Sequence, residues 1–381
     1  MANTLTGLVP TLYESLDVIS RELVGFIPSV NLDSGVARAA LGQTVMSHVV
    51  PASTASDLTP GVTAPNDGDQ VIGNVTLAIT KVRGVPVRWN GTEQRGINHG
   101  PGYHSILVNQ FTQAMRTLCN EIEVDTAIAA QVAASRAYGT AGTVPFATAG
   151  DYTDASNVLK ILLDNGAPTS DLRMVVNTAA GANLRGKQGG KVNEAGSDSI
   201  LRQGVLLDIH GFQVRESAAI VNAVKGTGAS YTSSTAGFAI GATSIAIITG
   251  TGTVLAGDVV TFAGDTTKYI VATGVAAAGT IVLAAPGLRQ AIPAAATAMT
   301  IGANYSANVA FDRNAIVLAT RAPALPEEGD MADDRMIITD PKSGLSFEVS
   351  LYKQYRQIRY EIAMAWGVKA VKPAHIAALL G

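Results

Sequence analysis

The chain has 381 residues, of which only 15% are charged, with 27 lysines and arginines against 30 aspartates and glutamates. Soluble domains carry roughly 25% charged residues, so much of this surface must be covered by something other than charge, which favours association with other chains. The even balance excludes a polybasic nucleic-acid binder. A single cysteine, Cys119, excludes an intrachain disulfide framework and a cysteine-based zinc site, and indicates a reducing compartment.

The first hundred residues predict a helix followed by extended segments. Thr11-Leu-Tyr-Glu matches a capping box, so a short amphipathic helix is expected to begin at Thr11. The strongest strand candidates are residues 75–82 and 85–89, joined by a turn at Arg83-Gly84. They predict a long, extended β-hairpin. It has too few apolar residues for a core of its own, so we expect it to lie against another surface.

A long helix is predicted from about residue 103 to 136, because apolar residues recur there every three or four positions. At 1.5 Å per residue it would span roughly 50 Å and act as a spine. A second helix at residues 154–164, closed by Asn165-Gly166, precedes a short buried strand at 174–176 and an alternating, hairpin-like segment at 204–217. Together these pieces indicate an α+β unit.

The segment from about residue 226 to 304 differs in composition from its neighbours. Its charged residues are Asp258, Asp265, Lys268 and Arg289. It contains four short apolar runs bounded by glycine, at residues 244–249, 259–262, 269–273 and 280–284. This spacing predicts a small all-β module inserted into the host unit. Gly, Ser and Thr interrupt the uncharged stretch, which favours packed β-structure over a membrane span.

The C-terminal stretch predicts further strands and one acidic loop. The strands are expected at residues 308–319, 335–339, 345–352 and 357–366, and a small apolar tail follows. The loop, at residues 323–334, is bounded by prolines and carries several carboxylates, which favours a solvated loop over a catalytic acid pair.

No complete catalytic or metal-binding motif is present. The best match is Gly181-Ala-Asn-Leu-Arg-Gly-Lys187, which fits G-x-x-x-x-G-K but has Gln188 where a P-loop places the Ser or Thr that ligates magnesium, so a flexible polar loop is favoured. His99 and His104 are five positions apart, a spacing that no common zinc motif uses, so loop histidines are favoured. We therefore expect no catalytic centre, no cofactor and no metal.

Charged side chains alternate along the predicted hairpin and just after it. The basic residues are Lys81, Arg83, Arg88 and Arg95, and Glu93 lies among them. Two interpretations stay open: these charges keep exposed strand edges from pairing wrongly, or they form salt bridges between subunits. The second suits a projecting arm. Arg83, Arg88, Glu93 and Arg95 are therefore the candidate subunit-contact residues.

Four segments carry a resemblance to a known family. The most specific is Arg359-Tyr-Glu-Ile-Ala-Met-Ala-Trp366-Gly-Val-Lys-Ala-Val-Lys-Pro373, which is similar to the closing strand of coat proteins of the phage P-twenty-two type. Residues 308–319 and 340–346 are similar to that family's preceding strands, and residues 257–264 resemble a strand of its inserted domain. Together with the order of the elements, they resemble the major capsid proteins of tailed bacteriophages with the Hong Kong 97 fold.

The resemblance implies an α+β, Hong Kong 97-type capsid fold with a long spine helix, an extended E-loop hairpin and an inserted small all-β domain. In chain order, the implied parts are an N-arm, the E-loop region, a peripheral domain with the spine helix, the first part of an axial domain, the inserted β-domain, the returning strands of the peripheral domain and the closing segment of the axial domain. Their residues are 1–34, 35–100, 101–148, 149–225, 226–304, 305–358 and 359–381.

The implied function is that of a shell subunit without a catalytic centre. Copies of the chain would form pentamers and hexamers around packaged double-stranded DNA, without sequence-specific binding and without a membrane. By resemblance, a scaffolding protein and a portal would guide assembly in the bacterial host cytoplasm, and the chain would end in the virion capsid. The main alternative is an encapsulin-like nanocompartment shell, which shares the fold and differs in cargo. A hydrolase and another phage structural protein are further alternatives.

Overall fold

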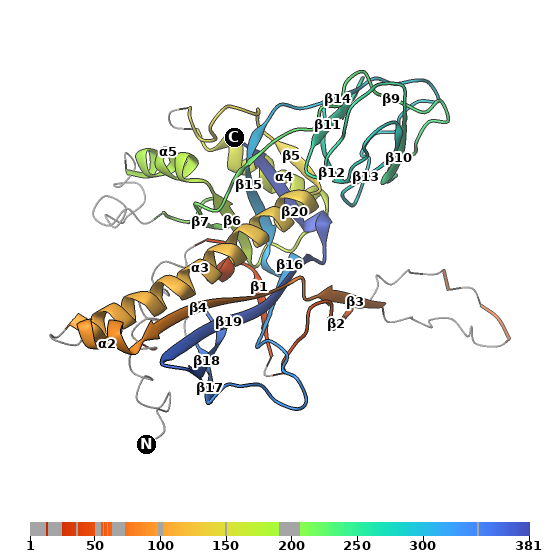
Figure 1. Ribbon diagram of the computed structural model, residues 1–381. Coiled ribbons are helices and arrows are strands. Elements are labelled where there is room, and N and C mark those ends of the chain that lie inside the picture. Colours follow the sequence, from red (N-terminus) through yellow and green to blue (C-terminus); the bar gives the residue numbers. More distant parts are fainter. Residues whose placement is uncertain are drawn as a thin grey trace.

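The computed structural model describes residues 25–35, 37–49, 73–97, 102–148, 151–189, 206–340 and 343–381, together with residues 13, 55, 57, 58 and 60–62. Of the helix expected from Thr11, only Tyr13 lies among them, and His99 and the side chain of His104 lie outside them. Figure 1 shows two sheet-containing regions joined by one long helix, with a two-stranded ribbon projecting to one side.

The long helix predicted as a spine is α3 (Gly102–Ala133). Its apolar residues Leu107, Phe111, Met115 and Leu118 are buried, and because they are three or four positions apart they form one face of the helix. That face is part of a hydrophobic core that also contains residues from strands of both sheets. One of these residues is Trp366 of the first sheet. The helix therefore ties the two regions together (Figure 1).

The first sheet gathers six strands from distant parts of the chain: β1 (Asn31–Ser34), β4 (Lys81–Asn90), β16 (Ile316–Arg321), β17 (Asp334–Thr339), β18 (Ser346–Gln354) and β19 (Gln357–Ala370). The longest strand, β19, pairs with β4 on one edge. On its other edge it pairs first with β18 and then with β16. Apart from the parallel pair of β1 and β16, these pairs are antiparallel.

The prediction that residues 75–82 and 85–89 pair with each other as a hairpin is wrong. The strand β3 (Gly73–Ala78) pairs with β2 (Thr44–Val49), and Arg83-Gly84, expected to form the turn, lies inside β4. The chain passes from the β2–β3 ribbon into the first sheet at Ile79-Thr80. There ten residues of β4 pair with ten residues of β19, which gives a longer ladder of backbone hydrogen bonds than the predicted hairpin would have.

The second sheet has twelve strands, and the strands of its host part are β5 (Arg136–Tyr138), β6 (Leu172–Val176), β7 (Phe212–Glu216), β8 (Asn222–Ala223), β15 (Tyr305–Asp312) and β20 (Ile376–Leu380). The expected apolar tail is β20, a fully buried strand between β15 and β5. The single strand predicted over residues 308–319 is interrupted by the short helix η3 (Arg313–Ala315), so that β15 and β16 join different sheets.

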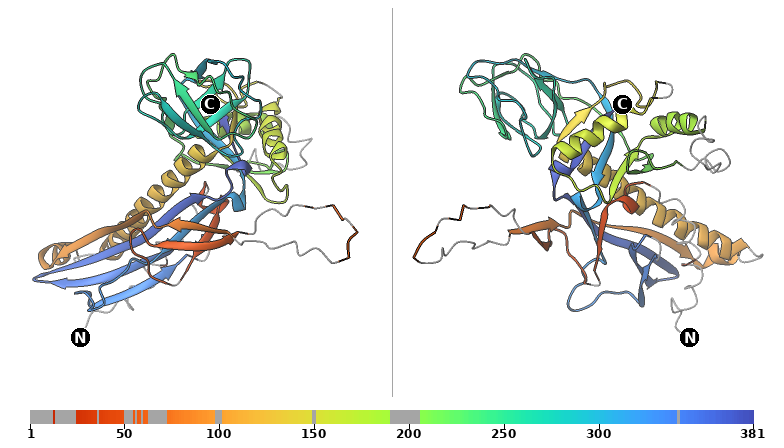
Figure 2. Two further views of the ribbon diagram at one scale, coloured as in Figure 1. Left: turned by 90° about the vertical axis from the view of Figure 1, so that its right-hand side faces the viewer. Right: turned by 180° about the vertical axis from the view of Figure 1, so that it is seen from behind.

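The predicted all-β module is present as six strands: β9 (Thr232–Ser233), β10 (Ser244–Ile248), β11 (Val259–Phe262), β12 (Lys268–Thr273), β13 (Gly279–Leu283) and β14 (Met299–Ile301). The four predicted runs coincide with β10 to β13. The module has its own hydrophobic core, which includes Tyr231, Ile245 and Val271. It joins the host sheet where β12 pairs with β5. Figure 2 shows it at one end of the molecule.

The helices α4 (Thr153–Asp164) and α5 (Thr178–Gly189) lie beside the second sheet, and α4 confirms the predicted second helix. The prediction of a loop at residues 181–187 is wrong, because these residues are part of the helix α5. The side chain of Asn177 caps this helix by accepting a hydrogen bond from the backbone N–H of Ala180 at 2.8 Å. The incomplete P-loop pattern therefore lies on a helix and not in a phosphate-binding loop.

The hairpin expected over residues 204–217 is only partly present. Within the described residues a tight turn occurs at His210-Gly211, both with positive φ (49° and 82°), and one bridge joins Ile209 to Phe212. The following strand, β7, pairs in parallel with β6 instead of folding back on a preceding strand. The parallel partner is buried along its whole length, so it provides a larger apolar contact.

The described residues also form four short helices: η2 (Ile27–Ser29), α2 (Gly91–Ile97), η3 and η4 (Pro373–His375). The expected domain boundary at residue 359 falls inside β19, and residues 305–358 contribute strands to both sheets. The reason is the crossing at η3, where the chain leaves the second sheet and enters the first. The division of the chain into named domains therefore stays a proposal.

Candidate intersubunit surfaces

The most prominent surface feature is the two-stranded ribbon of β2 and β3. The two strands pair from Thr44 with Ala78 to Val49 with Gly73, and with no other named strand. Figures 1 and 2 show that the ribbon points away from the rest of the molecule. Its side chain at Met46 is 62% exposed. An isolated two-stranded ribbon is marginally stable in water, so the outer part of this element requires a surface that the described part of the chain does not provide.

The base of the ribbon is fixed to the first sheet. Leu77 and Ile79 are buried in a small cluster with Ala39, Ala319 and Ala365. The backbone N–H of Thr80 donates to the carbonyl of Trp366 at 3.0 Å. The ribbon is therefore attached to the first sheet at its base, while its outer part projects from the molecule as an arm.

Gly367 permits the closest approach between the ribbon and the sheet. A Cβ atom at this position would lie 2.1 Å from the backbone oxygen of Ala78, far inside contact distance. Both contacting groups belong to regular strands, β19 and β3, which leaves little freedom to move apart. The glycine is therefore required by packing.

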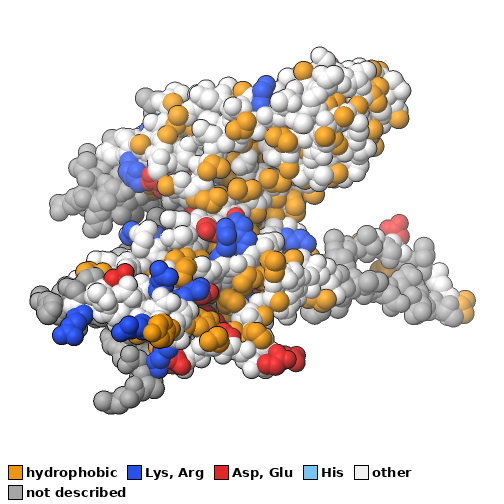
Figure 3. All heavy atoms as spheres, viewed as in Figure 1, with side chains coloured by type: hydrophobic (Ala, Val, Ile, Leu, Met, Phe, Trp, Pro, Cys, Tyr) orange, Lys and Arg blue, Asp and Glu red, His pale blue; other side chains and the backbone are white. Residues whose placement is uncertain are grey.

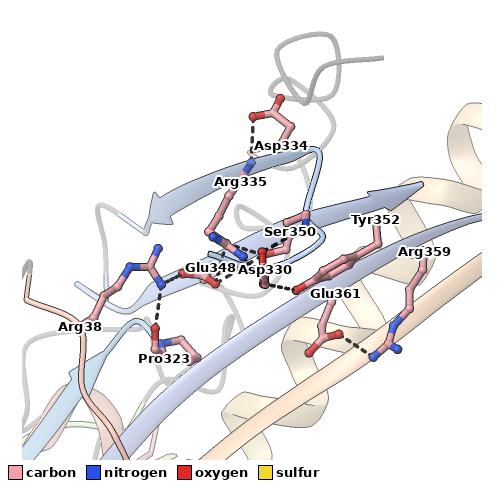
Figure 4. A network of polar contacts seen from close by, with 11 residues as sticks. Arg38, Pro323, Asp330, Asp334, Arg335, Glu348, Ser350, Tyr352, Arg359 and Glu361 are labelled. Atoms are coloured by element: carbon pink, nitrogen blue, oxygen red, sulfur yellow. Dashed lines mark hydrogen bonds and ion pairs between the residues drawn. The ribbon is translucent and has the colours of Figure 1, made fainter. Parts of the chain in front are cut away.

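A network of charged side chains surrounds Glu348 on β18 (Figure 4). The Glu348 side chain is only 5% exposed, and its two oxygens form ion pairs with Arg38 and Arg335. Arg38 also donates to the carbonyl of Pro323 at 2.7 Å. The neighbouring residue Ala39 forms an isolated parallel β-bridge with Pro323 through the backbone. Glu348 thus joins the segment that leads into the ribbon, the edge strand β17 and the start of the acidic loop.

The acidic loop is attached to the same network. Arg335 pairs with Asp330, which also accepts a hydrogen bond from the hydroxyl of Tyr352 at 3.1 Å. The backbone N–H of Ala332 and then the Arg335 guanidinium lower the pKa of Asp330. The loop expected to be merely solvated is therefore partly ordered by its carboxylates.

One of the predicted subunit-contact residues, Arg83, forms an ion pair within the chain. Arg83 on β4 donates to Glu121 on α3 at 3.1 Å, beside the pair of Lys81 and Asp125 at 2.8 Å. Asp125 also accepts from the indole N–H of Trp366 at 2.9 Å. These contacts fasten β4 and β19 to α3 and are structural.

The other members of the predicted set lie near the start of α2. The carboxylate of Glu93 accepts from the backbone N–H of Asn90 at 3.1 Å, and Asn90 accepts from the N–H of Glu93 at 2.8 Å, which is a capping box. Arg88 and Arg95 are exposed, and neither has an ion pair with another described residue. All four candidates lie on β4 and α2 and not on the ribbon, and their role in subunit contact stays a prediction.

The sequence analysis did not predict the ion pair of Arg38 and Glu348, because the two residues are far apart in the chain and no local pattern marks either of them. It also missed Tyr355, which is 89% exposed in the turn between β18 and β19. Figure 3 shows charged side chains gathered over the lower region of the molecule, while the face of the β-module is almost free of them.

The described residues contain no group of three or more His, Cys, Asp or Glu side chains that could hold a metal ion. Among them, no helix is both long and apolar enough to span a bilayer. Cys119 is buried on α3, where burial, followed by Asp340 and Glu123, raises its pKa to about 12. Its thiol is therefore protonated at neutral pH and is a packing residue.

No protein-family model and no curated protein matches the sequence. Solved structures do match. The capsid structure of the cyanophage P-SCSP1u shares 11% identity, covers 94% of this chain and 88% of that chain, and has a TM-score of 0.51. A structure of Mycobacterium phage Che8 shares 14% identity over 90% of this chain and 88% of that chain with a TM-score of 0.45. The mature capsid of bacteriophage PhiM1 shares 10% identity over 93% and 86% with a TM-score of 0.44.

The cyanophage match shows the fold. The chain shares its mixed α+β fold with this phage capsid structure, and in this chain the fold comprises the spine helix α3, two sheets and a projecting ribbon. The resemblance found in the sequence is thereby confirmed for the fold. The finer likeness to coat proteins of the P-twenty-two type stays a prediction.

Proposed function

We propose that this chain is a major capsid protein that self-assembles into an icosahedral shell through repeated contacts between copies. The observation that carries the proposal is the β2–β3 ribbon, which is anchored at its base and projects without a core of its own. Such an element gains apolar burial only from a neighbour. The fold, which is that of phage capsid proteins, supports the same assignment.

Shell formation also suits the composition. A closed shell repeats a few contacts many times, so modest contacts give a stable assembly through valency. A chain with 15% charged residues and a formal net charge of −3 has little charge repulsion to oppose such packing. The near-neutral charge also suits a wall that encloses double-stranded DNA without binding it tightly.

The proposal extends to arrangement and partners. Copies form pentamers and hexamers, a scaffolding protein and a portal direct assembly in the host cytoplasm, and the finished shell is the virion capsid around double-stranded DNA. The chain acts without catalysis. The alternative, an encapsulin-like compartment, requires the same contacts and differs in enclosing a protein cargo.

The experiment is expression of the chain alone and with the other structural proteins of its virus, followed by gradient sedimentation and negative-stain microscopy. We expect closed polyhedral particles in the fast-sedimenting fraction. Nuclease-protected DNA in particles from infected cells would support the phage capsid, whereas protected enzyme cargo would favour the encapsulin-like alternative. A chain that remains monomeric under all these conditions would contradict both.

A further inference from the structure

A pocket of about 440 Å³ lies where the β-module meets its host. One wall comes from β5 and the residues after it, another from α4, and the third from Thr266, Thr267 and Lys268 at the start of β12. The pairing of β12 with β5 holds these walls together. We call it the junction pocket. Its shape depends on the module being docked on the second sheet.

The junction pocket is lined by more positive than negative charge. Its charged lining residues are Arg136, Lys160, Lys268 and Asp164, and the remaining lining residues include several hydroxyl groups. Arg289 lies close enough to act on Arg136, because burial and then Arg289 lower the pKa of Arg136. One carboxylate therefore faces three lining cations, with a fourth cation nearby.

Neutral groups take most of the hydrogen bonds of these cations. Arg136, whose side chain is 8% exposed, donates from Nη2 to the carbonyl of Ile161 at 3.2 Å and to the amide oxygen of Asn165 at 2.8 Å. Its nearest carboxylate, Asp164, is 3.8 Å from Nη1, and its buried Nε has no hydrogen-bond partner. Lys268 donates to the carbonyl of Gly139.

A buried guanidinium whose ion pair with Asp164 is as long as 3.8 Å is only partly compensated, and an anion from outside would complete the compensation. Guanidinium and ammonium groups with nearby hydroxyls are the donors that phosphate oxygens prefer in proteins. We propose that the junction pocket binds a phosphoryl group. The pocket is larger than one phosphate, so the group belongs either to a free phosphorylated molecule or to the backbone of a nucleic acid.

The test uses the purified full-length protein in whatever assembly state it adopts. Calorimetric titration with inorganic phosphate measures binding of the free anion, and anisotropy of a labelled 20-nucleotide strand measures binding of the backbone. The variants are Lys160→Gln and Lys268→Gln, singly and together. Lys353→Gln, on β18 in the other sheet, removes the same charge elsewhere and is the matched control. Lys160 is exposed, so its replacement leaves the fold intact.

We expect saturable binding of phosphate or of the strand, with about one site per chain. The double variant should weaken it roughly tenfold or more, as loss of hydrogen bonds to charged groups does, while Lys353→Gln leaves it unchanged. Competition of phosphate with the strand assigns the site to nucleic-acid backbone, and binding of phosphate alone assigns it to a free phosphorylated molecule. Absence of both kinds of binding, or equal weakening in Lys353→Gln, would overturn the proposal.

Discussion

Glu348 shows how much of the fold depends on one buried side chain. Its carboxylate lies between Arg38 and Arg335, which belong to segments separated by almost three hundred residues (Figure 4). Removing one partner of a buried ion pair leaves an uncompensated charge, which costs more than the pair itself contributes. The segment leading into the ribbon should therefore loosen when this carboxylate is lost.

We predict that Glu348→Gln lowers the free energy of unfolding by about 2 kcal/mol or more, since the pair is largely buried. Glu361→Gln is the control, because Glu361 pairs with Arg359 where both side chains are partly exposed. Exposed pairs contribute about 0–1 kcal/mol. Urea unfolding of both variants measures the difference. Equal stabilities would show that the network around Glu348 is not a structural tie.

Gly367 makes a second prediction at this scale. Gly367→Ala places a methyl group against the backbone oxygen of Ala78, and overpacking of this kind costs roughly 1–3 kcal/mol. The melting temperature should fall. Gly91→Ala is the matched control, because nothing lies within 4 Å of a Cβ at Gly91. If the two variants melt together, the close approach of β3 and β19 is not as tight as described.

Cys119 supplies a chemical test of the core. Because its pKa is raised to about 12, almost no thiolate is present at pH 8 in the folded chain. We predict that iodoacetamide leaves the native protein unlabelled at pH 8 and labels it fully in denaturant, as followed by intact mass. Rapid labelling of the native protein would mean that the face of α3 that carries Cys119 is open.

At this scale the sequence is a poor guide to the candidate contact residues. Alternating charge at Arg83 and Arg88 indicates an exposed strand, and the structure agrees that both are exposed. Nothing in the local pattern shows that Arg83 pairs with Glu121, because that contact depends on where α3 comes to lie relative to β4. The capping box of Asn90 and Glu93 is a local contact, but Glu93 was interpreted only as one of the alternating charges.

Elements with a strong local period are the ones that the sequence predicts well. α3, α4 and the strands β10 to β13 follow from apolar spacing and glycine punctuation, and the structure confirms them. The pairing of β4 could not be predicted, because its partner β19 begins 276 residues after Lys81 and only tertiary packing selects it. The apolar tail was expected, but its place as the strand β20 between β15 and β5 was not, since a five-residue run carries no period.

The ribbon makes the prediction that belongs to the scale of elements. Replacing residues 46–76 by Asn-Gly would remove the exposed outer part of the ribbon, Met46 included, and close it directly beyond the pair of Val45 and Leu77 with a two-residue turn. We expect the shortened chain to keep its melting temperature as a dissociated subunit, because the buried base of the ribbon is unchanged. Assembled particles should be fewer or should dissociate at lower denaturant concentration.

Gradient sedimentation compares the shortened and full-length chains at equal concentration. The control exchanges a segment of the acidic loop, Pro326-Glu-Glu-Gly329, for Pro-Ser-Ser-Gly, which alters another exposed surface without shortening the ribbon. Particles of normal yield and stability from the shortened chain would remove the ribbon from the account of assembly.

At the scale of the whole molecule, different parts of the chain bury their apolar residues to different extents. α3 and the two sheets supply a continuous core, the β-module has a core of its own, and the ribbon has only its base buried. The fold could be predicted from the order of these parts. How they meet, including the junction of β12 with β5, required the structure.

The most direct test of the central claim is a cryo-electron microscopy reconstruction of the particles that the chain forms, with the subunit traced. The account predicts a closed shell in which β2 and β3 lie against a neighbouring copy and bury Met46 there. A reconstruction in which the ribbon folds back on its own subunit, or stands free in solvent while the shell is intact, would contradict it.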